Sequence, residues 1–261
     1  MQDASYHRRI ELGASWIAAS EDIVVFTGAG ISTDSGIPDF RGPDGVWTRR
    51  DAGLPPPSWK VPPSLVRPNA GHLAIADLQA LGKLRFLISQ NVDNLHLASG
   101  IQPDRLAELH GNGSLMKCMD CDRRYTREDI GWDEARFGKA YRSSEPVAGQ
   151  PVCACGGRII SSVVNFGDPM PIREMEEAAE HARACDLFIA AGSSLLVSPA
   201  NEFPILALRA GARLVIINRE PTPIDDHAQL LFREGISQVL PDLVAAARRI
   251  LATCDRDVDL L

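Results

Sequence analysis

The chain has 261 residues, of which 45% are hydrophobic and 23% charged, and its formal net charge is −7 at pH 7. This composition is that of an ordinary soluble globular protein, and the acidic excess argues against a nucleic-acid scaffold held by overall charge. No apolar run reaches the roughly 18 residues of a membrane span, and the N-terminal segment lacks a secretory signal's apolar core. We therefore expect an intracellular protein, cytoplasmic if bacterial, with no membrane partner, no evident nucleic-acid partner, and reduced or metal-bound cysteines.

Helical patterns alternate with apolar strands along most of the chain. In chain order the patterns predict a helix at 5–20, a strand at 22–27, a loop or short helices at 41–68, a helix at 70–82, a strand at 84–89, a strand at 186–191, a helix at 201–211, a strand at 213–218 and an amphipathic helix at about 238–252. This alternation predicts an α/β fold, a Rossmann-like parallel sheet with helices on both faces.

Two segments interrupt this pattern. Residues 41–68 are rich in proline and glycine, and the segment that holds four cysteines shows no strand–helix alternation. We expect the Rossmann-like domain to comprise 1–40, 69–112 and 158–261, with a cofactor-binding loop or helical insert at 41–68 and a small zinc-binding module at 113–157.

The first apolar strand stops at Gly28-Ala29-Gly30, a turn typical of dinucleotide sites. A glycine turn followed by a helix start presents backbone N–H groups and a positive helix end to a phosphate. The dehydrogenase pattern G-x-G-x-x-G is broken, because Thr33 occupies the third glycine position. The sequence therefore predicts a dinucleotide site whose chemistry is not hydride transfer.

Polar or glycine clusters follow each of the four predicted strands. They lie at 27–30, 89–93, 192–194 and 218–220. Each cluster alone is as well explained by turns and helix caps. In open α/β sheets, however, ligands bind beyond the carboxyl ends of the strands. Four clusters at the same edge therefore predict a binding site.

Several longer motifs occur in a recognisable order. They are GAGISTDSGIPDFRG, QNVDNLH, HGN, a four-cysteine segment, FGD, GSSLLVSPAN and INREP. Between about residues 20 and 240 the chain resembles the sirtuins, which are NAD-dependent protein lysine deacylases. GPDGVW at 42–47 is similar to the branch that includes chromatin-associated sirtuins.

The resemblance implies NAD as the dinucleotide and an acyl-lysine protein or peptide as the partner. The implied products are nicotinamide, O-acyl-ADP-ribose and free lysine. Two alternatives remain open: a protein mono-ADP-ribosyltransferase that uses the same pocket, and a non-catalytic module that binds NAD or ADP-ribose.

The resemblance also assigns catalytic roles to three residues. His110 matches the family's base, and Asn91 and Asp93 match its nicotinamide-pocket pair. A neutral imidazole with a pKa near 6.5 suits a base at pH 7. Without the family pattern, His110 would be read as a structural histidine. His72 and His96 are expected to be structural or exposed.

The resemblance assigns further residues to the cofactor and to the substrate. Those assigned to the cofactor are Gly28, Ala29, Gly30, Thr33, Asp39, Phe40, Arg41, Trp47, Gln90, Gly192, Ser193, Ser194, Asn218, Glu220 and Ile236. Those assigned to the peptide are Val164, Asn165, Phe166 and Gly167 on one edge, and Leu195, Leu196 and Val197 on another. A peptide bound as an added strand gains affinity from its backbone, so its sequence matters little.

The cysteines predict a closed metal site. Cys118-x-x-Cys121 is a zinc knuckle, and its partner pair, Cys153 and Cys155, has C-x-C spacing where C-x-x-C is usual. Four thiolates leave no open coordination position, so we expect a structural Zn²⁺. Unligated cysteines and a redox pair are the alternatives.

The acyl group is constrained only in part. The resemblance implies that enzymes acting on succinyl or malonyl groups carry a Tyr-x-x-Arg element near 48–65. No tyrosine occurs in that stretch. An acidic acyl group is therefore not expected, while acetyl and longer fatty acyl groups stay open.

Overall fold

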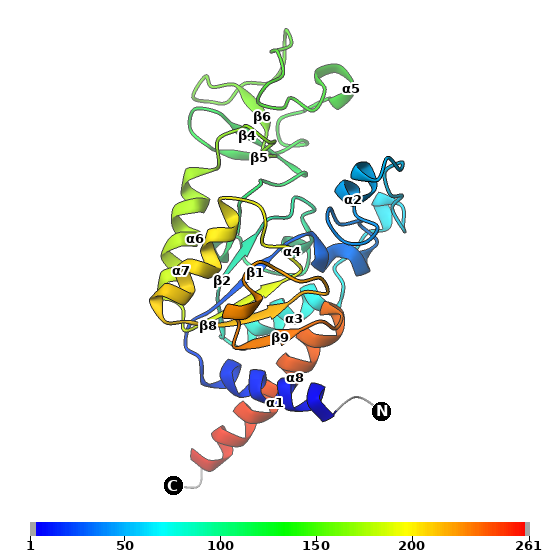
Figure 1. Ribbon diagram of the computed structural model, residues 1–261. Helices are drawn as coiled ribbons and strands as arrows, with labels where there is room; N and C mark the ends of the chain where they lie inside the picture. Colours follow the sequence, from blue (N-terminus) through cyan, green and yellow to red (C-terminus); the bar gives the residue numbers. More distant parts are fainter. Residues whose placement is uncertain (1–3, 259–261) are drawn as a thin grey trace. The chain divides into compact units, whose positions relative to one another are not determined.

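The computed structural model describes residues 4–258 (Figure 1). The chain divides into two compact units, which are described separately. The larger unit comprises the chain up to 89, residues 95–107 and the chain from 176 onward, and the smaller comprises 90–94 and 108–175. The expected zinc-binding segment, 113–157, lies within the smaller unit.

The larger unit is built on a six-stranded sheet. Its strands are β1 (Ile23–Thr27), β2 (Leu84–Ser89), β3 (Leu106–Glu108), β7 (Leu187–Ala191), β8 (Arg213–Ile217) and β9 (Leu230–Phe232), in the order β3-β2-β1-β7-β8-β9. The pairs β1–β2, β1–β7, β7–β8 and β8–β9 are parallel. Strands β1 and β7 are wholly buried, which explains why IVVFT and LFIAA are continuous apolar runs.

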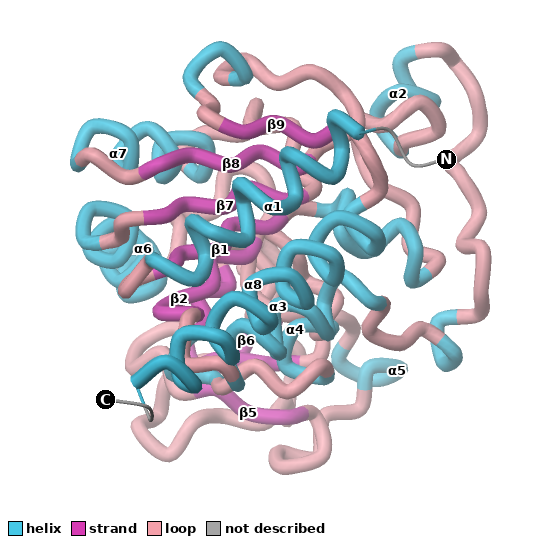
Figure 2. The backbone as a smooth tube through the Cα atoms, turned by 90° about the horizontal axis from the view of Figure 1, so that it is seen from below, coloured by secondary structure: helices cyan, strands magenta, loops and turns pink. Residues whose placement is uncertain are grey.

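Helices cover both faces of this sheet (Figure 2). On one face, α8 (Ile236–Val258) packs against α1 (Ala4–Ala19) and α3 (Ala70–Ala80). On the other, α7 (Phe203–Ala210) packs against β7 and β8, and His181 of α6 (Ile172–Ala184) stacks on Phe86 of β2. The predicted Rossmann-like α/β fold is therefore confirmed.

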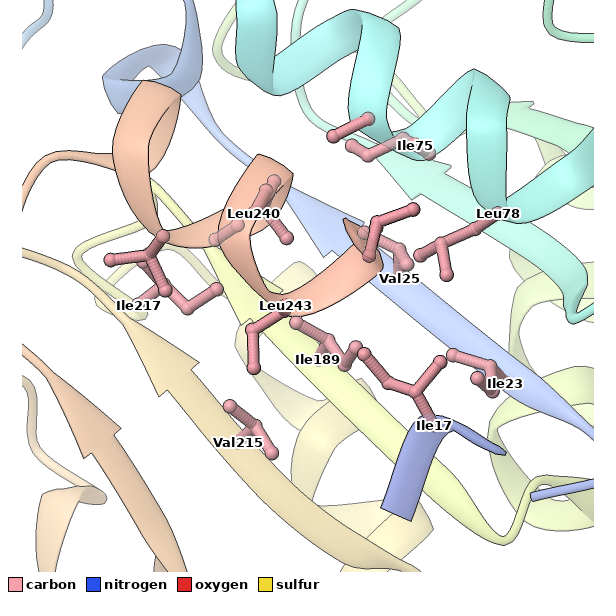
Figure 3. Packing of buried hydrophobic residues seen from close by; sticks show 14 of the residues in the cluster. Ile17, Ile23, Val25, Ile75, Leu78, Ile189, Val215, Ile217, Leu240 and Leu243 are labelled. Carbon is pink, nitrogen blue, oxygen red and sulfur yellow. The ribbon is translucent and has the colours of Figure 1, made fainter. Parts of the chain in front are cut away.

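The main core lies between the sheet and the layer formed by α1, α3 and α8 (Figure 3). It joins Ile17 of α1, Ile23 and Val25 of β1, Ile75 and Leu78 of α3, Ile189 of β7, Val215 and Ile217 of β8, and Leu240 and Leu243 of α8. Alternate residues of β1 and β7 enter this cluster, as the two-residue repeat of a strand requires. The core fixes the strands whose ends carry the candidate site.

The segment expected to be irregular contains only short helices. These are α2 (Val46–Asp51) and a 3₁₀-helix at Pro63–Leu65. The helix expected at 201–211 begins as a 3₁₀ turn, Ala200–Glu202, before α7. The helix α4 (Leu95–Ala98) follows β2 after a short polar segment.

The structure differs from the sequence prediction at several elements. The helix start expected after the glycine turn is a 3₁₀-helix, Ala29–Ser35, which ends at Gly36 with φ 92°. The edge strands β3 and β9 and the helix α6 were not predicted. The two strands have three residues each. Runs this short carry little periodic signal.

The smaller unit contains its own antiparallel sheet. Its strands, β4 (Leu115–Cys118), β5 (Arg124–Thr126) and β6 (Ile159–Ser161), lie in the order β5-β4-β6. A short helix, α5 (Glu134–Phe137), and a small core of Met116, Trp132, Phe137 and Ile159 complete it.

The helices of the described part of the chain were also compared with the length and apolarity of a membrane span. None of those within residues 4–258 is long and apolar enough to cross a bilayer.

The core makes a direct stability prediction. Leu243 is 1% exposed on α8, whereas Leu12 is 45% exposed on α1. Leu243→Ala should lower the free energy of unfolding by about 2–5 kcal/mol, because it leaves a cavity. The matched change Leu12→Ala should cost less than about 0.5 kcal/mol. Urea unfolding measures both, and equal losses would contradict the core described here.

Candidate active site and metal centre

Glycines join the carboxyl ends of β1 and β7. The backbone N–H of Gly28 donates to the carbonyl of Ala191 (3.3 Å), and that of Gly30 donates to the carbonyl of Gly192 (2.8 Å). A Cβ on Gly30 would lie 2.8 Å from Gly192 Cα. Contacts this short exclude any side chain at Gly30. The turn therefore serves close packing, and phosphate contacts here must use groups other than these two amides.

The expected adenine-stacking residue lies beside the same turn. Ile236, at the start of α8, is 8% exposed. Its Cδ1 would be 2.8 Å from a Cβ on Gly192, and its Cγ2 would be 3.1 Å from one on Gly71. Ser193 is buried, and its hydroxyl accepts from the backbone N–H of Leu195 (3.2 Å). The larger unit thus brings Gly28, Gly30, Gly192 and Ile236 together.

Two buried histidines support this turn. His96 Nε2 lies 2.8 Å from Thr27 Oγ1, and His72 Nε2 lies 3.5 Å from Ser32 Oγ. The two imidazole rings are 5.0 Å apart. Burial lowers the pKa of His96 to about 3, so this ring is neutral at physiological pH. Both histidines are buried, so the expectation of a structural role holds and that of exposure does not.

The loop expected to contact the cofactor is ordered by its own side chains. Asp39 Oδ1 accepts from the backbone N–H of Gly42 (3.0 Å). The rings of Phe40 and Trp47 are 5.9 Å apart, and the guanidinium of Arg50 lies 4.4 Å from the Trp47 ring centroid. Phe40 is 49% exposed. The loop therefore presents an accessible aromatic ring on a fixed backbone.

The polar end of β8 is held by an arginine that the sequence analysis did not single out. Arg233 Nη1 donates to the carbonyls of Asn218 (2.9 Å) and Glu220 (2.8 Å), and Arg233 Nη2 pairs with Asp225. The side-chain amide of Asn218 also donates to the carbonyl of Glu220 (2.7 Å). These bonds fix the conformation of the loop that follows β8.

In the smaller unit, one hydrogen bond determines the chemistry of His110. Its Nδ1 lies 2.7 Å from the carbonyl oxygen of Gln90. A carbonyl only accepts, so Nδ1 carries the proton and Nε2 keeps its lone pair. Burial lowers the pKa of His110, so the ring is neutral at pH 7. Nε2 is therefore able to act as a base.

The segment 90–94, which carries Asn91 and Asp93, is tied to the residues that follow His110. The backbone N–H of Gly113 donates to the carbonyl of Val92 (2.7 Å), and Asn112 Nδ2 donates to Asn94 Oδ1 (2.9 Å). Asn91 and Asp93 are both half-buried. The smaller unit thus assembles all three residues that sequence reasoning had given catalytic roles.

The segment expected to bind peptide begins at the His110 loop. The backbone N–H of Val164 donates to the carbonyl of His110 (2.9 Å). Gly111, at φ 76°, has no room for a side chain, because a Cβ would lie 1.9 Å from the carbonyl oxygen of Ser162. Phe166 is 83% exposed. The backbone therefore fixes this edge while its aromatic side chain faces solvent.

The four predicted metal ligands form one cluster. Their Sγ atoms all lie within 4.8 Å of one another. The pairs Cys118–Cys155, Cys121–Cys153 and Cys121–Cys155 are each 3.5 Å apart. A tetrahedral zinc site with Zn–S bonds of about 2.3 Å has S–S edges of about 3.8 Å. The C-x-C pair therefore fits Zn²⁺ despite its shortened spacing.

The backbone around the cluster is also adapted to the thiolates. A Cβ on Gly157 would lie 2.5 Å from Cys118 Sγ, so only glycine fits there. The Tyr125 hydroxyl lies 3.0 Å from Cys153 Sγ. Four sulfur ligands leave no position for a substrate, so the zinc is structural.

Comparison with known proteins identifies the family. The model of the Sir2 family matches residues 28–55 and 58–199. The "NAD-dependent protein deacetylase 1" of Bradyrhizobium diazoefficiens is 43% identical over 255 residues, covering 90% of this chain and 95% of that protein.

Two solved structures are similar over nearly the whole chain. One, described under "Structural Basis for the Mechanism and Regulation of Sir2 Enzymes", is 35% identical with TM-score 0.71, covering 94% of this chain and 99% of that one. The other, "Sir2Af2 bound to a myristoylated histone peptide", is 32% identical with TM-score 0.67, covering 95% and 99%. The chain belongs to the Sir2 family, and it is an NAD-dependent protein-lysine deacylase.

The metal centre makes a prediction about stability. Cys118→Ser should abolish stoichiometric zinc and lower Tm by roughly 10 °C, because zinc binding to such a site contributes several kcal/mol to folding. Cys185 is buried outside the cluster, so Cys185→Ala should keep the metal. Atomic absorption and thermal denaturation check both variants. A Cys118→Ser protein with unchanged Tm would refute a structural zinc.

Proposed function

We propose that His110 is the general base of this deacylase and that Nε2 is the atom that receives the proton. When bound, NAD would supply the ribose carbon that accepts the acyl oxygen as nicotinamide departs, and one water would be consumed, so that acyl-lysine, NAD and water give nicotinamide, O-acyl-ADP-ribose and free lysine. His110 takes a proton through the ribose hydroxyls, which allows the 2′-hydroxyl to attack the acyl group. The observation that carries this assignment is the Nδ1 bond to Gln90, which leaves Nε2 unprotonated.

The other residues of the segment after β2 hold the nicotinamide half. Asp93 accepts a hydrogen bond from the carboxamide NH₂, Asn91 positions a water or a ribose hydroxyl, and Gln90 bonds the ribose. The exposed ring of Phe40 hinders the back-reaction by covering the vacated nicotinamide position. Arg41 contacts phosphate or orders its loop, and Asp39 holds the turn that carries both residues.

The strand ends of the larger unit hold the rest of the dinucleotide. Ala29, Gly30 and Thr33 lie along the phosphates, as do Ser193 and Ser194 after β7. Asn218 and Glu220 hold the adenosine ribose, and Ile236 stacks on adenine. Trp47 makes an additional cofactor contact. Support comes from the position of Gly28, Gly30 and Gly192, which pack together at the carboxyl ends of β1 and β7, where open α/β sheets bind their ligands.

We assign the acyl-lysine peptide to Val164-Asn165-Phe166-Gly167, to which it adds as a strand, and the resemblance assigns Leu195, Leu196 and Val197 to the peptide as well. Phe166 and Leu196 are 83% and 52% exposed, so both side chains are accessible to a peptide. The acyl group is acetyl or a longer fatty chain, and a Sir2 relative holds a myristoylated histone peptide.

We divide the chain by function into three parts. Residues 1–40, 69–112 and 158–261 bind NAD, residues 41–68 form the cofactor loop, and residues 113–157 bind zinc. We place the protein in the reducing interior of the cell, because the zinc site needs four reduced thiols.

His110→Ala should lower deacylation of an acetyl-lysine peptide by roughly 10²–10⁴-fold while leaving the Kd for NAD nearly unchanged. In the wild type, kcat/KM should fall on the acid side only below pH 6.5, because burial lowers the pKa of the base. Mass spectrometry of O-acetyl-ADP-ribose measures the rate of the variant and the pH profile of the wild type. If radiolabel from NAD became attached to protein and no deacylated peptide formed, the activity would be ADP-ribosyl transfer and not deacylation.

Asp93→Asn should weaken product inhibition by nicotinamide. Loss of a charged acceptor costs about 1.5–3 kcal/mol, which raises the inhibition constant roughly 10- to 100-fold. Steady-state inhibition by nicotinamide measures this change, and Asp104→Asn, an exposed acid on the larger unit, is the control. An unchanged inhibition constant would remove Asp93 from the nicotinamide pocket.

A further inference from the structure

Two buried carboxylates in the smaller unit share one arginine. Glu108 is the last residue of β3, and Glu174 lies in the first turn of α6. Their side chains are buried, because the two residues are 4% and 5% exposed. Arg124 of β5 donates from Nη1 to Glu108 Oε2 (3.2 Å) and pairs through Nη2 with Glu174 Oε1. Burying two anions on one cation is costly unless the arrangement is held by further hydrogen bonds.

Glu108 uses its second oxygen on the loop that follows His110. Glu108 Oε1 accepts from Asn112 Nδ2 (2.7 Å), and the same amide group donates to Asn94 Oδ1 (2.9 Å). The orientation of the Asn112 amide is set, because its Oδ1 accepts from the backbone N–H of Ser114 (2.9 Å). Both oxygens of Glu108 therefore act as acceptors, an arrangement that favours the ionised carboxylate.

Arg124 favours this ionised state. Burial raises the pKa of Glu108, while the Asn112 hydrogen bond and the charge of Arg124 act in the opposite direction. Glu174 Oε2 is buried and has no hydrogen-bond partner among the residues that the structure describes. Without the guanidinium, both carboxylates would be left buried and uncompensated, and Glu108 would take up a proton.

The network involves residues on both sides of His110 in the sequence. Glu108 and Asn112 lie two residues before and two residues after His110. Asn112 is also fixed through its backbone, because its N–H donates to Ser162 Oγ (3.0 Å) and its carbonyl accepts from the same hydroxyl (2.7 Å). Through Asn94 the network reaches the segment 90–94, whose Gln90 carbonyl sets the His110 tautomer. Arg124 itself stands three residues after the zinc ligand Cys121.

We propose that Arg124, acting through Glu108 and Asn112, is a positioning residue for His110. It thereby connects the β4–β5 hairpin, which carries the zinc ligands Cys118 and Cys121, to the base of the deacylation reaction. The inference rests on the proposed role of His110. Arg124 touches neither substrate nor the reacting atoms. Its charge favours the ionised form of Glu108, Glu108 orients Asn112 by accepting from its amide, and Asn112 holds the two backbone segments whose spacing directs Nε2.

A double-mutant cycle tests this role. Arg124→Met, His110→Ala and the double variant are compared with wild type for single-turnover deacylation of an acetyl-lysine peptide at saturating NAD. Arg124→Met should lower the rate at least tenfold in the wild-type background and less than twofold in the His110→Ala background, because it acts through His110. Arg124→Lys should retain part of the activity that Arg124→Met loses, because lysine keeps the positive charge. The retention should be incomplete, because a single ammonium cannot bridge both carboxylates as a guanidinium does.

Lys139→Met, which removes an exposed cation elsewhere in the smaller unit, is the matched control and should keep wild-type rates. Glu108→Gln is the second variant if Arg124→Met fails to fold, because it keeps the side-chain shape and removes one buried charge. Equal losses from Arg124→Met in both backgrounds, or wild-type rates from the folded Arg124→Met or Glu108→Gln protein, would overturn the inference. A fully active His110→Ala protein would instead overturn the proposed base.

Discussion

The hydrogen bond between His110 Nδ1 and the Gln90 carbonyl is the constraint on which the account of catalysis depends. The bond uses the backbone carbonyl of Gln90 as its acceptor, and it fixes which ring nitrogen of His110 carries the proton. Burial keeps the ring neutral, so that the unprotonated nitrogen is Nε2. In the proposed mechanism the acyl-lysine supplies its own nucleophile, so one oriented base is the main catalytic group that the chain must provide.

Several close backbone contacts hold His110, the proposed base, in place. Gly111 permits a contact with the Ser162 carbonyl that any side chain would prevent. Val164 bonds to the His110 carbonyl, and Asn112 links the loop to Asn94. In the larger unit, the same strategy of close backbone contact and buried polar support appears at Gly30 and at the His72–His96 pair. In both regions a glycine without a side chain allows backbone segments to pack closely, which makes the backbone rigid.

The sequence predicted the parts of this structure that leave a strong periodic or compositional signal. The apolar runs of β1, β2, β7 and β8 are buried on a parallel sheet, and a buried strand of five or six residues reads clearly from sequence. The four cysteines were also predictable, because thiolates at knuckle spacing have few other uses. Their C-x-C pair is tolerated because Gly157 lets the chain turn against Cys118.

What the sequence could not predict depends on contacts between distant residues. The three-residue strands β3 and β9 form only because neighbouring strands are present to pair with them. Arg124 and Glu174 are 50 residues apart in sequence, so their ion pair leaves no local pattern. The glycine turn after β1 suggested a helix start that binds phosphate through its amides. Two of those amides instead bond β7 and the glycine that follows it, because the two strand ends pack more closely than a sequence motif can reveal.

The protonation state of His110 is the most direct test of the account. ¹⁵N-resolved NMR of the imidazole, assigned by comparison with His110→Ala, reports both the tautomer and the pKa. The account predicts a neutral ring protonated at Nδ1 with a pKa below about 6.5. A proton on Nε2 at neutral pH, or a pKa at or above that value, would contradict it.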